Sequence, residues 1–168
     1  NADAVDRIFQ IKRRVATKQI LVLIRSTGQL NRFVTAIPDM ARRLIHRHWP
    51  GGVTLVFTAK PSLPPNLTAK TGKIGIRLPA HPVAAALVEA VDFPVTATSA
   101  NLAGQSGCRA IDELPPVIMV HVDLFLDAGI LAGGKGSSVV DVTGNQPVIL
   151  REGVVPSAGI LNQDSRID

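Results

Sequence analysis

The run Ile20–Ile24 (ILVLI) contains five apolar residues with no polar residue between them. A strand that is polar on neither face is covered by packing on both, so this run predicts a strand inside a layered sheet. Residues 51–59 (GGVTLVFTA) predict a second buried strand, entered through two glycines. A chain of 168 residues is long enough to build such a core within one domain.

The remaining elements follow from periodicity and turn residues. In residues 73–80 the apolar Ile74, Ile76 and Leu78 alternate with Lys73, Gly75 and Arg77, which predicts that the two sets face opposite sides of a strand. Helices are predicted at 3–14, 27–37, 38–49, 81–91 and 109–114. The first strand spans 19–26, and further strands are predicted at 93–101, 122–129, 137–143 and 147–153. Early alternation of helices and strands, with hairpin-like strands later, indicates one mixed α/β sheet covered by helices.

Charge and composition limit the function classes. Residues 1–50 hold ten Lys and Arg against three Asp, a net charge of +7, whereas the rest of the chain sums to −2. This asymmetry favours an anionic partner, either a nucleotide or a nucleic acid, although a solvated helix face also explains Arg42, Arg43 and Arg47. No apolar run has the length of about 18 to 20 residues that a membrane span needs. One cysteine and no apolar leader favour a cytoplasmic location.

Several polar side chains stand at the ends or on the open faces of predicted strands, where ligands of α/β sheets bind. They are Lys12, Arg14, Arg77, Ser99, Asn101, Ser137, Ser138 and Arg151. Each also has an ordinary explanation: Arg77 fits a surface ion pair, and Ser99 with Asn101 fits a cap or an Asx turn. His46 and His48 face different sides of a helix, so no metal site is predicted. The residues alone indicate a cationic cleft that binds a ligand.

Five segments occur together in a familiar order and spacing. They are IKRR, HWPGGVTLVF, GIRLPAHPVAAAL, PVTATSANLAGQSG and SSVVDVTGNQPVILREG. In this combination the chain resembles the YrdC-like threonylcarbamoyl-AMP synthase family from about residue 2 to residue 158. The resemblance implies a single-domain twisted mixed sheet with helices, YrdC/RibB-like, around a positively charged cavity. The expected domain is 1–158, with a tail at 159–168. The resemblance implies that this domain is N-terminally incomplete, because family members usually begin with a strand ending in a PTETVYGLG-like stretch.

The resemblance also implies an activity and a set of contacts. The family joins L-threonine, bicarbonate and ATP, with Mg²⁺, into threonylcarbamoyl-adenylate and pyrophosphate. A tRNA threonylcarbamoyl-transferase complex then modifies position 37 of tRNA. The family's K-x-R and S-x-N motifs fall on Lys12, Arg14, Ser99 and Asn101. The implied ATP contacts are these four with Lys18 and Arg151, the implied catalytic pair is Lys12 with Arg14, and the implied threonine contacts are Arg77 and Ser137. Leu23 departs from the family, which commonly has a polar residue there.

Two other functions remain as alternatives at this point. One is an RNA-binding module of the same fold without adenylate chemistry, although the chain has one Trp, five Phe and no Tyr for stacking on bases. The other is the carbamoyl-adenylate-forming domain of a hydrogenase-maturation protein, whose zinc-finger cysteines are absent from this sequence.

Overall fold

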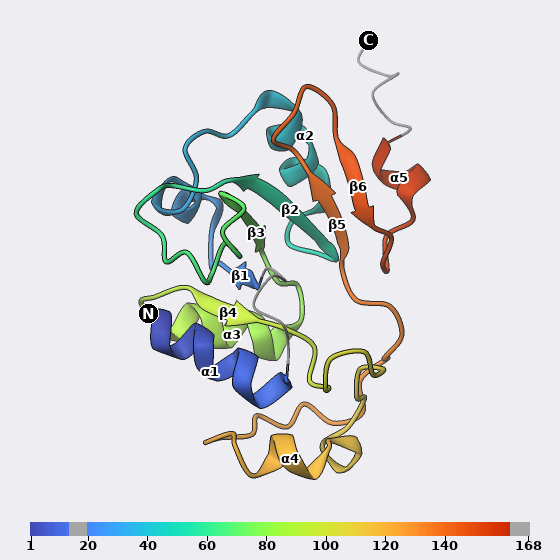
Figure 1. The fold of residues 1–168 in the computed structure, drawn as a ribbon. Coiled ribbons are helices and arrows are strands. Elements are labelled where there is room, and N and C mark those ends of the chain that lie inside the picture. The colour runs from blue at the N-terminus through green and yellow to red at the C-terminus, as the bar shows by residue number, and fades with distance from the viewer. Residues whose placement is uncertain (14–19, 162–168) are drawn as a thin grey trace.

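Six strands form one mixed sheet in the order β4-β1-β3-β2-β5-β6 (Figure 1). The structure is a computed structural model, and it describes residues 1–13 and 20–161. The strands are β1 (Leu21–Leu23), β2 (Val53–Thr58), β3 (Lys73–Arg77), β4 (Val95–Ala97), β5 (Ser138–Asp141) and β6 (Val148–Arg151). β1 is parallel to β3, and β2 is parallel to β5, while the other neighbouring pairs are antiparallel.

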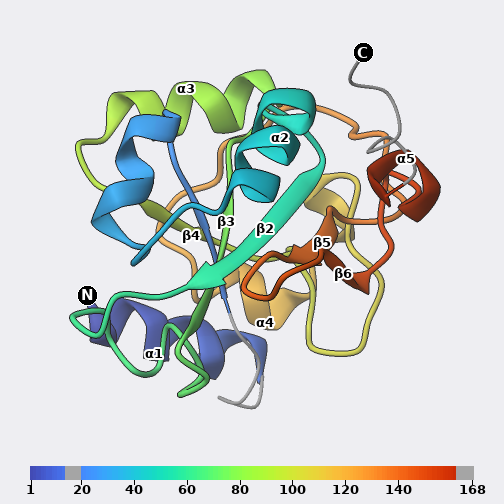
Figure 2. The same ribbon diagram turned by 90° about the horizontal axis from the view of Figure 1, so that it is seen from above.

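Helices pack against these strands. Val5 and Phe9 of α1 share one buried cluster with Ala41 and Leu44 of α2, and Figure 2 shows these two helices near opposite ends of the strands. The α-helices are α1 (Ala2–Lys12), α2 (Asp39–His48), α3 (Pro82–Ala90), α4 (Pro116–Met119) and α5 (Ser157–Leu161), and the 3-10 helices are η1 (Thr27–Arg32) and η2 (Ile111–Glu113). Asn1 caps α1 by accepting a hydrogen bond from Asp3 N. Within the described residues, no helix is both long enough and apolar enough to cross a membrane.

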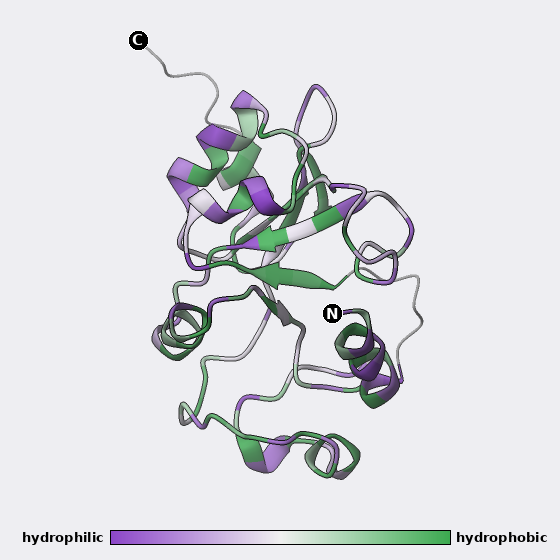
Figure 3. Ribbon diagram, turned by 90° about the vertical axis from the view of Figure 1, so that its left-hand side faces the viewer, coloured by the Kyte–Doolittle hydropathy of each residue, from purple (hydrophilic) through white to green (hydrophobic). Residues whose placement is uncertain are grey.

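The core is built on one face of the sheet. Val22, Ile76, Leu55 and Val140 lie in register across β1, β3, β2 and β5, and each is at most 2% exposed. Because side chains alternate along a strand, the residues at every second position lie on the same face of the sheet as this row. The residues between them lie on the opposite face. Figure 3 shows strands that are green over most of their length, one of them with white and purple residues between the green ones, and helices in both colours.

Most of the predicted elements are present. The mixed α/β sheet is confirmed, and so is the alternation in β3, where Ile74 and Ile76 are fully buried. The helix predicted at 27–37 is a 3-10 helix that ends at Arg32. Ile160 on α5 lies in the segment 159–168 predicted as a tail, and its side chain is 3% exposed and packs in the core. The boundary of the domain stays a prediction.

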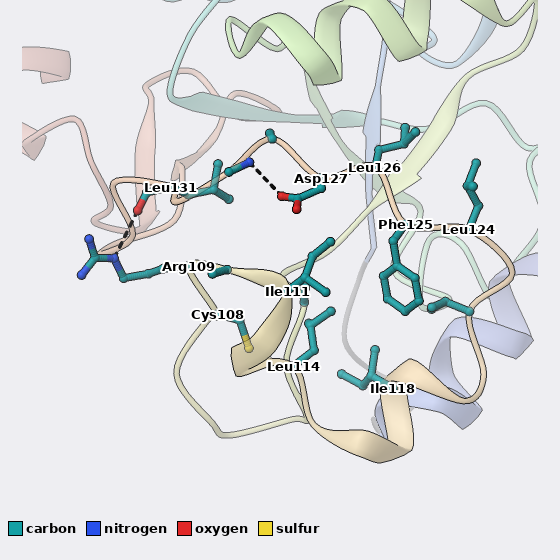
Figure 4. A pocket seen from close by; sticks show the side chains of 15 residues that line it. Cys108, Arg109, Ile111, Leu114, Ile118, Leu124, Phe125, Leu126, Asp127 and Leu131 are labelled. Carbon is teal, nitrogen blue, oxygen red and sulfur yellow. Dashed lines mark hydrogen bonds between the residues drawn. The ribbon is translucent and has the colours of Figure 1, made fainter.

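The strand predicted at 122–129 is wrong. Among the residues that the structure describes, this segment has no strand partner, and Leu124 and Leu126 are exposed. Phe125 points instead toward Ile118 of α4 (Figure 4), and both side chains line an apolar cavity of about 270 Å³. The helix α4 itself was not predicted from the sequence. An alternating apolar pattern indicates a strand only where a second strand can bond to it, and no neighbour is available here.

An ion pair joins β3 to β5 across β2, which lies between them in the sheet. Lys73 Nζ donates to Asp141 Oδ2 at 2.7 Å, and Thr143 donates to Asp141 Oδ1 from its main-chain nitrogen and its hydroxyl. Burial raises the pKa of Asp141, but the hydrogen bonds from Lys73 and Thr143 outweigh it and hold the pKa below its ordinary value. The carboxylate form of Asp141 therefore stabilises the folded state.

We expect Asp141→Asn to lower the free energy of unfolding by about 1–2 kcal/mol at pH 7, because the charge-assisted hydrogen bonds are lost. A depressed folded pKa contributes stability above the unfolded pKa of about 3.9, and that stability disappears as the pH falls through the folded value. Urea unfolding of both proteins at pH 7 and pH 3 measures this, and the difference between them shrinks at the lower pH.

The matched control is Asp123→Asn, which breaks the exposed pair between Asp123 and Arg7. Exposed pairs contribute about 0–1 kcal/mol, so this variant is expected to stay close to wild type. Equal losses at both pH values in Asp141→Asn would contradict the assignment.

Candidate functional site

The face of the sheet opposite the core forms the floor of a cavity of about 520 Å³. Its floor residues are the alternate positions of four strands: Leu21, Leu23, Thr54, Val56, Gly75, Arg77 and Val139. The walls come from the start of α3 with His81, from residues 97–101 after β4, from the loop 134–137 and from Arg151 on β6. Segments far apart in the chain thus meet over one side of the sheet.

Arg77 ends β3 on the cavity floor. Its Nε donates to the carbonyl oxygen of Gly51 at 2.7 Å, which fixes the guanidinium plane. Burial lowers the pKa of Arg77, yet arginine remains protonated in proteins because its ordinary pKa lies so far above neutrality. The two Nη groups remain available for a bidentate contact with a planar anion such as a carboxylate.

Ser137 and Arg151 are in direct contact. The Arg151 Nη2 and Nε groups donate to the Ser137 carbonyl oxygen at 2.7 and 3.2 Å. The Ser137 hydroxyl is buried and lies 2.8 Å from the hydroxyl of Thr54 on the cavity floor. The resemblance assigns Ser137 to threonine and Arg151 to the nucleotide, so this contact would be where the two ligands adjoin.

Ser99 and Asn101 form a linked pair at the cavity wall. Ser99 Oγ donates to Asn101 Oδ1, and Asn101 Nδ2 donates to the carbonyl oxygen of Gln105. Because its proton is already donated, Ser99 Oγ faces the cavity as a hydrogen-bond acceptor, suited to a hydroxyl or amino group of a ligand. The same bonds organise the loop that follows β4, and a contact of this pair with a ligand stays a prediction.

The cavity combines cations with neutral groups. Arg77 and Arg151 are held by main-chain carbonyl oxygens, which orient a guanidinium without cancelling its charge. Among the described lining residues there is no Asp or Glu. Such a surface suits a ligand that carries phosphate and carboxylate groups.

The predicted site residues fall into three groups. Arg77, Ser99, Asn101, Ser137 and Arg151 line this one cavity, and their roles toward a ligand stay predictions. Lys12 is buried behind the wall, bonded to the segment that carries Ser99 and Asn101, and is not among the lining residues. Arg14 and Lys18 lie outside the described residues.

Sequence reasoning missed several residues of the cavity. Thr54 is polar inside an apolar run and shares the face of Val56, so alternation would have placed it on the floor. His81 precedes α3 and reaches the wall without a distinctive sequence signal. Leu23, which departs from the family pattern, makes part of the floor apolar.

The next feature is whether side chains of the site could bind a metal ion. Among residues 1–13 and 20–161, no group of three or more His, Cys, Asp or Glu side chains is placed to hold one. Mg²⁺ is usually bound through carboxylates together with substrate phosphates. The described wall offers hydroxyl and amide oxygens and no carboxylate, so it does not fit a magnesium ion held by the protein alone.

Comparison with known proteins gives consistent matches. The family model described as Telomere recombination, the Sua5/YciO/YrdC domain, matches residues 1–153. A threonylcarbamoyl-AMP synthase of Pyrococcus abyssi is 33% identical over 92% of this chain, which spans 45% of that protein. A putative threonylcarbamoyl-AMP synthase of Mycobacterium tuberculosis is 34% identical over 95% of this chain, which spans 73% of it. The crystal structure of P. abyssi Sua5 complexed with L-threonine matches with a TM-score of 0.84 at 33% identity, covering 91% of this chain and 45% of that one.

Gly153 sets the distance between two walls of the site. A Cβ at this position would lie 2.1 Å from the Gly136 carbonyl oxygen and 2.4 Å from the Ser137 carbonyl carbon. Gly153 N also donates to the Ser138 hydroxyl at 2.9 Å. The segment after β6 is therefore pressed against the loop that carries Ser137.

We expect Gly153→Ala to destabilise the fold by about 1–3 kcal/mol, because the added methyl group overlaps main-chain atoms that cannot move aside cheaply. Chemical denaturation measures the loss. Gly159→Ala is the matched control, since a Cβ there meets nothing within 4 Å and the residue lies in α5. That variant is expected to match or exceed wild-type stability by up to about 1 kcal/mol. Equal behaviour of the two variants would contradict the close approach.

Proposed function

Because this chain belongs to the Sua5/YciO/YrdC family, we propose that it joins L-threonine, bicarbonate and ATP into threonylcarbamoyl-adenylate and pyrophosphate. The chain spans less than half of the Pyrococcus relative, so the activity of the longer proteins is carried over to it here as a proposal. The observation that carries it is the single cavity shared by Arg77, Ser99, Asn101, Ser137 and Arg151, with its cations held by carbonyl groups.

The threonine end lies at Arg77. Its free Nη groups bind the threonine carboxylate as a fork, while the bond to Gly51 prevents the guanidinium from turning away. The neighbouring hydroxyls of Ser137 and Thr54 bind the polar remainder of the amino acid. The similar Pyrococcus protein was crystallised in complex with L-threonine, which supports this class of ligand.

The nucleotide end lies between Arg151 and the Ser99–Asn101 segment. Arg151 keeps its Nη1 group for a phosphate oxygen, and Arg14 and Lys18, outside the described residues, are proposed as further ATP contacts. Mg²⁺ would be supplied together with ATP and would offset part of the negative charge of the phosphates. The product serves N6-threonylcarbamoylation of adenosine 37 in tRNA through a separate transferase complex.

Two steps make up the reaction. The threonine amine forms an N–C bond with bicarbonate, which loses water as the carbamate is made. A carbamate oxygen then attacks the α-phosphorus of ATP, and the bond to the β-phosphate breaks to release pyrophosphate. Neither step needs a nucleophilic side chain. The residues act by positioning the reactants and by stabilising negative charge on the phosphates.

The direct test is pyrophosphate release from ATP by this chain. We expect release only when both L-threonine and bicarbonate are present. Release that needs neither compound would overturn the synthase assignment. Tight RNA binding without any turnover would favour the RNA-binding alternative.

We expect Arg77→Met to lower kcat/KM for L-threonine by about 10- to 100-fold, because a bidentate charge-assisted contact is lost. Arg77→Lys keeps the charge without the fork and is expected to recover only part of the loss. Arg32→Met, which removes an exposed cation at the end of η1, serves as control. An unchanged dependence on threonine concentration in Arg77→Met would contradict the carboxylate contact.

A further inference from the structure

Thr54 is a polar residue in the middle of the sheet. It belongs to β2, which lies between β3 and β5, and it is only 1% exposed. Its neighbours along the strand, Val53 and Leu55, are fully buried apolar residues. A buried hydroxyl without a hydrogen bond is costly, so a polar residue here needs a partner. The Ser137 hydroxyl, 2.8 Å away, supplies it.

The direction of the Thr54 side chain is set by its methyl group. A Cβ built at Gly75 would lie 3.3 Å from Thr54 Cγ2, so this methyl group lies over the glycine of the neighbouring strand β3. A β-branched side chain has few χ1 rotamers available to it. The strand itself is held by main-chain pairing on both sides. One rotamer therefore places the methyl group over Gly75 and the hydroxyl against Ser137.

The side chain of Ser137 is less restrained. Ser137 stands just before β5, and an unbranched serine side chain has three staggered rotamers. Arg151 Nη2 donates to the Ser137 carbonyl oxygen at 2.7 Å, which fixes the main chain. The same Nη2 group comes no nearer than 3.4 Å to the Ser137 hydroxyl, beyond the usual range of a strong bond. The shorter contact with Thr54 therefore dominates the orientation of this hydroxyl.

The hydroxyl pair lies beside Arg77 on the cavity floor. Leu55 pairs with Ile76 in the antiparallel register of β2 and β3, so Thr54 and Arg77 occupy the next facing positions. Thr54, Arg77 and Ser137 all line the same cavity. An amino acid held by its carboxylate at Arg77 would therefore meet the Ser137 hydroxyl in the direction that Thr54 sets.

We propose that Thr54 is a positioning residue, which fixes the Ser137 hydroxyl in the orientation that binds the amino acid held at Arg77. This inference rests on the proposed function and deepens it, because it gives the two hydroxyls of the threonine end different tasks. Thr54 is the fixed member of the pair, and Ser137 is the member that depends on it. Loss of the Thr54 hydroxyl acts on amino-acid binding through Ser137.

The first test measures the Ser137 side chain in the ligand-free protein. Thr54→Val keeps the branched shape and removes the hydroxyl, whereas Thr54→Ser keeps the hydroxyl. Three-bond NMR couplings between Hα and the Hβ protons of Ser137 report whether its χ1 angle is fixed. We expect a single rotamer in the wild-type protein, averaged couplings in Thr54→Val and recovery in Thr54→Ser. A single unchanged rotamer in Thr54→Val would overturn the proposal.

The matched control is Thr58→Val, which removes an exposed hydroxyl at the end of the same strand. This variant is expected to leave the Ser137 couplings unchanged. Should Thr54→Val fail to fold, Thr54→Cys replaces the hydroxyl by a weak hydrogen-bonding group, and the same couplings decide.

The second test is a double-mutant cycle for L-threonine with Thr54→Val and Ser137→Ala. We expect Thr54→Val to raise KM for L-threonine by about 3- to 10-fold, since one hydrogen bond of the substrate is misaligned. Thr54→Ser is expected to restore it. The double variant should be no worse than Ser137→Ala alone, because Thr54 then has no hydroxyl left to position.

Losses that multiply in the double variant would show two independent contacts and would overturn the positioning role. If the wild-type protein neither binds nor uses L-threonine, the proposed function fails, while the Ser137 couplings in the ligand-free protein still decide the role of Thr54.

Discussion

Hydrogen bonds from cationic side chains to main-chain carbonyl oxygens are the interaction on which this site depends. Arg77 bonds to Gly51, Arg151 to Ser137, and Lys12 to Ser99 and Asn101. A carbonyl group fixes a cation while leaving its full charge to act on a ligand, whereas a carboxylate would neutralise it. The pair of Lys73 with Asp141, which lies outside the cavity lining, shows the opposite arrangement and serves stability.

The sheet makes this arrangement possible because its two faces have different tasks. Ile74 and Ile76 are buried in the core. Because side chains alternate along β3, this burial also places Gly75 and Arg77 on the cavity floor. Because Gly75 has no side chain, the cavity keeps open space above the sheet beside Arg77. Core formation and site formation are thus two consequences of one register.

The same alternation explains how much could be predicted. Six of the seven predicted strands are present, and five predicted site residues share one cavity, because strand ends and open faces are local properties of the sequence. The strand at 122–129 could not be excluded beforehand, since its pattern is apolar and only the absence of a pairing neighbour decides against it. The burial of Lys12 was equally out of reach. Its acceptors lie on a segment 87 to 89 residues away, and nothing in the local pattern points to them.

Turn chemistry and ligand binding are not competing explanations for Ser99 and Asn101. A short polar side chain at the end of a strand can bind a ligand reproducibly only if its rotamer and its main chain are already fixed. The bonds from Lys12 and to Gln105 supply that order before any ligand arrives. The bond from Lys12 and the bond from Ser99 Oγ occupy both acceptor sites of Asn101 Oδ1, so the pair would meet a ligand through the Ser99 oxygen and the second proton of the Asn101 amide. The turn therefore determines which hydrogen-bonding groups of Ser99 and Asn101 are available to a ligand.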